Sequence, residues 1–87
     1  MSKVVFENSV VEEIRTLAQA NPKLLKKIFD LIDDVIKHPF EGIGKPEPLK
    51  HNYKGYWSRR ITDEHRLIYK IDAEKNVIVT GLQGHYD

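Results

Sequence analysis

The chain has no cysteine, one tryptophan and one methionine among its 87 residues, and it lacks a long apolar run. The absence of cysteine excludes disulfides and thiolate zinc sites, and it makes a reducing cytoplasm the expected location. No segment approaches the roughly 18 apolar residues that a membrane span needs, and no apolar segment typical of a secretion signal follows Met1. With 40% hydrophobic and 31% charged residues, the composition is that of an ordinary globular domain.

A chain of this length is expected to form one domain, residues 1–87, with room for one sheet and one layer of helices. Its free energy of unfolding is expected to be about 4–13 kcal/mol. Metal ligands are sparse, because Asp33 and Asp34 stand on a polar helix face without a His-x-x-x-His pattern or a paired-carboxylate cluster beside them. We therefore expect neither a metal site nor another cofactor.

Positive charge is concentrated in the middle of the chain. Residues 1–42 carry six basic and seven acidic side chains, residues 43–70 carry seven basic and three acidic, and residues 71–87 carry one basic and three acidic. A basic segment that also contains aromatic residues is typical of a protein that binds a polyanion, because phosphate contacts supply most of the affinity for nucleic acids. A solvated basic hairpin explains the charge alone equally well.

Apolar residues at helical spacing predict two helices, one over about residues 9–20 and one over about residues 21–37. Ser9 and Glu12 form a capping-box pattern at the start of the first helix. Asn21, which precedes a proline, is a favourable cap for the second helix. We expect the two helices to form an antiparallel hairpin.

Four strands are predicted, over residues 3–6, 56–61, 65–71 and 77–82. The turns between the last three are short, so these strands are expected to pair antiparallel. Residues 40–54 contain glycines and prolines and are predicted to form a long loop, which in a small domain is usually functional or mobile. The order β-α-α-β-β-β indicates an α+β fold, with a small antiparallel sheet and an N-terminal helical hairpin packed on one face.

Glu47 is a candidate general base within this loop. Pro46 and Pro48 restrict the backbone on both sides of it, so its position relative to the sheet is partly fixed. A carboxylate with an ordinary pKa of about 4.3 needs desolvation to act as a base near neutral pH, whereas neighbouring lysines and arginines keep it ionised. A solvated loop glutamate is the alternative interpretation.

The predicted hairpin after the loop carries Arg59, Arg60 and Arg66. Strand alternation places Arg66 on the face away from the helices, because Leu67 and Tyr69 belong to the better core face. A three-residue turn places Arg60 opposite Arg66, whereas a two-residue turn pairs Arg60 with Leu67. We favour the first, since two guanidiniums on one open face make a fork-shaped phosphate site. Surface arginines without a ligand are the alternative.

His85 and Tyr86 follow the last predicted strand. A histidine titrates near pH 6.5, at about which it can protonate a leaving alkoxide, and a tyrosine can stack on a base. Chain ends often fray, so an inert terminal pair is the competing interpretation.

Together these residues resemble a known family. Their order and spacing are similar to those of the YoeB/Txe toxins of bacterial toxin–antitoxin modules, within the RelE superfamily of ribosome-dependent mRNA interferases. The matching segments are residues 39–42, 44–52, 55–61, 64–69 and 85–86. Two positions depart from the family pattern: Asp87 adds a carboxylate after Tyr86, and Gly84 stands where a bulkier residue is frequent.

The resemblance implies a metal-independent endoribonuclease that cleaves mRNA in the ribosomal A site and thereby inhibits translation. It assigns Glu47 as the general base, Arg66 as the residue that stabilises the pentacovalent phosphate, His85 as the general acid, and Tyr86 as the residue that places a nucleotide. The RNA-binding residues are then Lys50, His51, Arg59 and Arg60.

The resemblance also implies partners: a cognate antitoxin, often of the YefM/Phd type, the bacterial ribosome with its mRNA, and a second copy in a homodimer. It implies no interaction with a membrane. An alternative is a non-catalytic toxin of the same fold that binds DNA gyrase, as ParE-type relatives do, although such relatives lack the Glu/Arg/His set. A third reading is an RNA-binding module that docks on ribosomal RNA without cutting a transcript.

Overall fold

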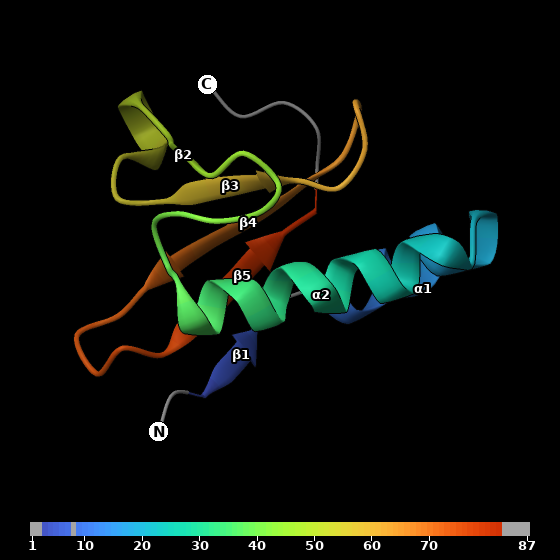
Figure 1. Ribbon diagram of the computed structural model, residues 1–87, viewed down its shortest axis with the longest axis horizontal. Coiled ribbons are helices and arrows are strands. Elements are labelled where there is room, and N and C mark those ends of the chain that lie inside the picture. The colour runs from blue at the N-terminus through green and yellow to red at the C-terminus, as the bar shows by residue number, and fades with distance from the viewer. Residues whose placement is uncertain (1–2, 8, 83–87) are drawn as a thin grey trace.

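The computed structural model describes residues 3–7 and 9–82, and it has the predicted α+β fold. Two helices pack beside each other on one face of a five-stranded sheet (Figure 1). The elements are β1 (Val4–Phe6), α1 (Val10–Ala20), α2 (Lys23–Lys37), β2 (Glu47–Pro48), β3 (Trp57–Arg60), β4 (Arg66–Ile71) and β5 (Val77–Gly81). Within the described ranges, no helix is long and apolar enough to span a membrane.

The sheet is mixed, whereas the sequence predicted an antiparallel sheet. Its strand order is β1-β5-β4-β3-β2, and all neighbours pair antiparallel except β1 and β5. β1 runs parallel to β5, with Val4 opposite Val77. A parallel pair needs a long connection between its strands, and the helical hairpin together with the meander of the later strands supplies one.

The core lies between the helices and one face of the sheet. The helices contribute their apolar stripes, and the central strands contribute alternate residues, as the period-two pattern predicts. The residues with at most 1% exposure include Ile28, Leu31, Val35, Leu67, Tyr69 and Val79.

The two helix starts differ from one another. The predicted capping box does not form: the Ser9 hydroxyl caps no backbone amide and instead lies 3.4 Å from a carboxylate oxygen of Glu13. The backbone of Ser9 (φ −92°, ψ 15°) lacks the extended conformation that directs a capping side chain at the first turn. At α2 the predicted cap is confirmed, because Asn21 accepts a hydrogen bond from the amide of Lys23 at 3.2 Å.

The segment predicted as a long loop contains regular structure. β2 pairs with β3, and a 3₁₀ turn follows at His51–Tyr53. The amide of Leu49 donates to the carbonyl of Tyr56 at 2.8 Å, and the amide of Arg60 donates to the carbonyl of Gly44 at 2.6 Å. These bonds need residues 56–60 as partners, so local sequence signals could not predict them.

Candidate active site on the open face of the sheet

The side chains of β3 alternate between the two faces of the sheet. Trp57 packs against the core, and Arg59 forms an ion pair with Asp34 of α2 at 2.5 Å. Successive side chains of a strand point to opposite faces. Ser58 and Arg60 therefore lie on the face turned away from the helices.

The strand register brings three of the predicted site residues to this face. Arg60 is paired with Arg66, which confirms the three-residue turn, and Glu47 is paired with Ser58. Directly paired residues project from the same side of a sheet, and diagonal neighbours lie about 7–8 Å apart. Glu47 is thus a diagonal neighbour of Arg60. We call this side of the sheet, with Glu47, Ser58, Arg60 and Arg66, the open face.

The sheet edge beyond Glu47 carries two further predicted residues. Lys50 and His51 are exposed and lie where β2 ends and the 3₁₀ turn begins. His51 has a positive φ of 57°, so the chain reverses sharply at this point. Glu47 is also exposed, and all three side chains are therefore accessible from solvent at one edge of the sheet.

The open face contains a further cation, Lys70, which is not among the predicted site residues. The ammonium group of Lys70 on β4 lies 3.4 Å from the hydroxyl of Tyr56 and 5.2 Å from its ring centroid. Strand alternation puts Lys70 on the same face as Arg66, and its contact with Tyr56 depends on the pairing of β3 with β4. The open face therefore combines one carboxylate with three cations, and an aromatic ring lies beside them.

Arg60 has an unusual hydrogen-bonding state. Its Nε is buried and has no partner, and it is the one side-chain nitrogen or oxygen with that property in the described part of the chain. A buried polar group without a partner is unfavourable and calls for an explanation.

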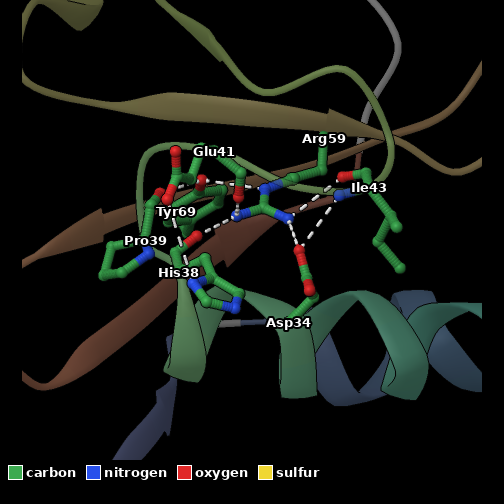
Figure 2. A network of polar contacts seen from close by, with 7 residues as sticks. All are labelled: Asp34, His38, Pro39, Glu41, Ile43, Arg59 and Tyr69. Atoms are coloured by element: carbon green, nitrogen blue, oxygen red, sulfur yellow. Dashed lines mark hydrogen bonds and ion pairs between the residues drawn. The ribbon is translucent and has the colours of Figure 1, made fainter.

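Arg59 corrects one of the sequence predictions. This residue, expected to bind RNA, is fully buried on the helix side of the sheet. Figure 2 shows its guanidinium surrounded by acceptors. Nη1 lies 2.5 Å from the Asp34 carboxylate, and Nε lies 3.2 Å from the Tyr69 hydroxyl. The other acceptors are the carbonyls of His38 (2.5 Å), Glu41 (2.8 Å) and Ile43 (3.0 Å). Arg59 is therefore not available to RNA.

The same contacts determine the charges in this network. The hydrogen bond from Arg59 lowers the pKa of Asp34 below its ordinary value, and a further hydrogen bond from the amide of Ile43 acts in the same direction. Burial raises the pKa of Tyr69 above its ordinary value. At neutral pH the network therefore holds one cation, one carboxylate and one neutral phenol. These groups stabilise the fold by pairing with one another.

Some predicted features cannot be placed. His85 and Tyr86, together with Gly84 and Asp87, lie outside the described residues. Elsewhere in the described ranges, no three His, Cys, Asp or Glu side chains are grouped as metal ligands. A pocket of about 380 Å³ lies between α1 and His65, and neither Glu47 nor the open-face arginines line it. It is therefore separate from the candidate site.

The chain matches a known protein family and curated relatives over nearly its whole length. Residues 6–86 match the family of YoeB-like toxins of bacterial type II toxin–antitoxin systems. Toxin YoeB of Escherichia coli K12 is 40% identical over 84 residues, which cover 97% of this chain and 99% of the relative. Toxin YoeB of Streptomyces coelicolor is 46% identical with the same coverage.

Solved structures are similar over nearly the whole chain. A YoeB/ParE toxin from Agrobacterium tumefaciens has a TM-score of 0.89 at 39% identity, covering 97% of this chain and 99% of that one. Toxin chains from Staphylococcus aureus have TM-scores of 0.84, from a YoeB–YefM complex (38% identity, 99% of both chains), and 0.87, from a YoeB dimer (37% identity, 98% of both chains).

The helical hairpin on a mixed sheet, with Glu47 and two arginines on its open face, thus defines a toxin of the RelE-like fold. More narrowly, the chain belongs to the family of YoeB-like toxins of bacterial type II toxin–antitoxin systems.

Proposed function

We propose that this toxin is a ribosome-dependent endoribonuclease that cleaves mRNA in the A site and thereby inhibits translation. The observation that carries the proposal is the strand register that sets Glu47 beside Arg60 and opposite Ser58, with Arg66 paired with Arg60 on the same face of the sheet. A carboxylate base on the same face as two guanidiniums supplies the proton acceptor and the charge stabilisation that metal-independent transfer at a phosphodiester needs.

The proposed reaction is an in-line displacement at phosphorus. Glu47 accepts the proton of a ribose 2′-hydroxyl, the 2′-oxygen forms a bond to phosphorus, and the bond from phosphorus to the 5′-oxygen breaks. Arg66 and Arg60 stabilise the negative charge on the non-bridging oxygens, and His85 donates a proton to the departing 5′-oxygen. The products are a 2′,3′-cyclic phosphate, or the 3′-phosphate formed from it by water, and a 5′-hydroxyl.

The other groups of the open face fit RNA binding. Lys50 and His51 are exposed at the edge beyond Glu47, where they reach the RNA backbone in this proposal. Lys70, with Tyr56 beside it, adds a further cation for a phosphate. Tyr86 places the nucleotide at the cleavage point.

Two protein partners belong to the proposal. A solved relative forms a complex with YefM and another is a dimer, so we extend to this toxin a YefM-type antitoxin and a homodimer. The open face has a net positive charge, and an acidic antitoxin segment bound there would compete directly with RNA.

The test is cleavage of a defined mRNA in a reconstituted translation system. We expect Glu47→Gln to lower the rate constant of cleavage about 10²- to 10⁴-fold, the range for a general base. Glu74→Gln, at an exposed turn between β4 and β5, is the matched control and should cleave like the wild type. Wild-type cleavage by Glu47→Gln would remove the basis of the proposal. Inhibition of DNA gyrase supercoiling by the purified protein, with mRNA intact, would favour the non-catalytic alternative.

A further inference from the structure

The guanidinium of Arg59 uses every one of its donors. Its five N–H groups meet five acceptors: the Asp34 carboxylate, the Tyr69 hydroxyl and three backbone carbonyls (Figure 2). The side chain is fully buried, so each bond forms away from water. Only a planar guanidinium supplies five donors in this fixed geometry, and lysine cannot replace it.

The three carbonyls belong to one short segment, residues 38–43, which joins α2 to the part of the chain that carries Glu47. Two further bonds hold the same segment. The Tyr69 hydroxyl donates to the carbonyl of Pro39 at 2.6 Å, and the amide of Ile43 donates to Asp34 at 3.0 Å. The polar cluster of Arg59, Asp34 and Tyr69 therefore fixes five backbone groups of this segment.

Apolar packing contributes less to holding the segment. Phe40 is 54% exposed and Ile43 is 52% exposed, although the Phe40 ring also contacts Trp57 with centroids 4.9 Å apart. A segment with exposed apolar side chains gains little stability from burial, because that gain is proportional to the area removed from water. The hydrogen bonds of the cluster are thus its main restraint.

This segment leads directly to the proposed base. Gly44 follows it and accepts the hydrogen bond of the Arg60 amide, and Glu47 is three residues further along the chain. β2 itself consists of two residues with two registered partners, Ser58 and Trp57. So short a strand is a weak restraint, and the position of Glu47 depends on what holds the chain before it.

We propose that Arg59, Asp34 and Tyr69 act as positioning residues, which hold Glu47 at its place beside Arg60 through the segment 38–43. The inference rests on the proposed function, since it assigns these buried groups a role in the cleavage step. None of the three touches the substrate, and each acts through the backbone that it binds.

The test is a double-mutant cycle in single-turnover cleavage of ribosome-bound mRNA. Tyr69→Phe removes one hydroxyl, and with it the bonds to Pro39 and Arg59, and we expect it to lower the rate constant of cleavage about tenfold with ribosome affinity unchanged. In a Glu47→Gln background the same change should have no further effect, because the two residues act as one unit. Ile28→Val, a core change on α2, controls for lost stability and should cleave at the wild-type rate. Multiplicative effects, or a wild-type rate for Tyr69→Phe, would overturn the inference.

A second readout separates this inference from the proposed function. Hydrogen exchange at the amides of Arg60 and Leu49, which bond to Gly44 and Tyr56, should accelerate about tenfold in Tyr69→Phe and in Asp34→Asn. Amides of β5 should keep their protection. If the wild type does not cleave mRNA, the proposed function fails, and the exchange rates still decide whether the cluster positions Glu47. Unchanged exchange at both amides would contradict the positioning role.

Discussion

Arginine is rarely buried, because the transfer of its charge out of water costs roughly several kcal/mol. Burial is tolerated when the charge is paired and fully hydrogen-bonded. Arg59 meets both conditions through Asp34, Tyr69 and the backbone of residues 38–43. Its immediate neighbour Arg60 faces the opposite side of the sheet. Two adjacent arginines in one basic run thus lie in different environments, because strand alternation directs them to opposite faces of the sheet.

At the scale of this residue pair we predict a pH-dependent stability. The pKa of Asp34 is lower in the folded protein than its ordinary value of 3.8, so the folded state binds fewer protons. The stability that this carboxylate contributes is therefore present above pH 3.8 and is lost as the pH falls through its lower folded pKa. Replacement by Asn should cost about 2–4 kcal/mol at neutral pH, because it leaves the guanidinium of Arg59 without its counter-ion.

The measurement is urea unfolding of the wild type and Asp34→Asn from neutral pH down to acid pH. The difference in the free energy of unfolding should shrink below pH 3.8. Asp33→Asn, the exposed neighbour on α2, should change stability by no more than about 0.5 kcal/mol. A difference between wild type and Asp34→Asn that stays constant with pH would contradict the prediction.

At the scale of elements, β2 and the turn before it decide where the proposed base stands. Gly44 has a φ of 78°, a left-handed conformation that glycine adopts without strain. It also lies against α2, since a β-carbon at Gly44 would be 2.6 Å from Cδ2 of Leu31. Gly55, in the turn before β3, has a φ of 96° and open space around it.

These two glycines form a matched pair for a prediction. Gly55→Ala should cost about 1–2 kcal/mol from backbone strain alone. Gly44→Ala adds an overlap with Leu31, so its total cost should be about 2–5 kcal/mol, and it should also displace β2 and slow the proposed cleavage. Urea denaturation gives the free energies of unfolding, and single-turnover cleavage at a temperature where both variants are folded gives the rates. Equal costs for the two substitutions would show that the contact with Leu31 is unimportant.

At the scale of the whole molecule, the sheet separates the hydrophobic core from a face that carries several cations. The helices cover one face, where Arg59 is neutralised by Asp34, and the open face keeps the cations Arg60, Arg66 and Lys70 beside one carboxylate. A small protein with a net charge of +1 thus presents a locally basic surface. Such a surface binds polyanions mainly by counterion release, so its affinity depends on salt.

We therefore predict that Arg60→Gln weakens binding of a single-stranded RNA oligonucleotide and lowers the slope of log K against log salt by about 0.7, the value for one phosphate contact on a single strand. Fluorescence anisotropy over a series of potassium chloride concentrations measures both quantities. Lys23→Gln, at the exposed start of α2, is the control and should leave the slope unchanged. The same slope for wild type and Arg60→Gln would mean that Arg60 makes no phosphate contact.

Much of the fold was predictable because its signals are local. The apolar stripes defined α1 and α2, Asn21 capped the second helix, and the alternation in β4 separated Leu67 and Tyr69 from Arg66. The pairing of Arg60 with Arg66, which was favoured over the pairing with Leu67 because it forms a phosphate site, is confirmed. The capping box failed because a pattern of residue types does not determine the backbone angles of Ser9.

The sequence by itself determined the two helices, four of the five strands and the basic middle segment, because periodicity and turn chemistry are properties of neighbouring residues. It also identified Glu47, Arg60 and Arg66 as site candidates, through their spacing along the chain. Only the tertiary structure decided that β1 runs parallel to β5, that β2 exists, and that Arg59 lies in the interior. These features depend on partners far away in the chain: Asp34 is 25 residues from Arg59, and β2 is a strand only because β3 supplies its hydrogen bonds. A basic run does not reveal which of its charges will meet a carboxylate from a helix.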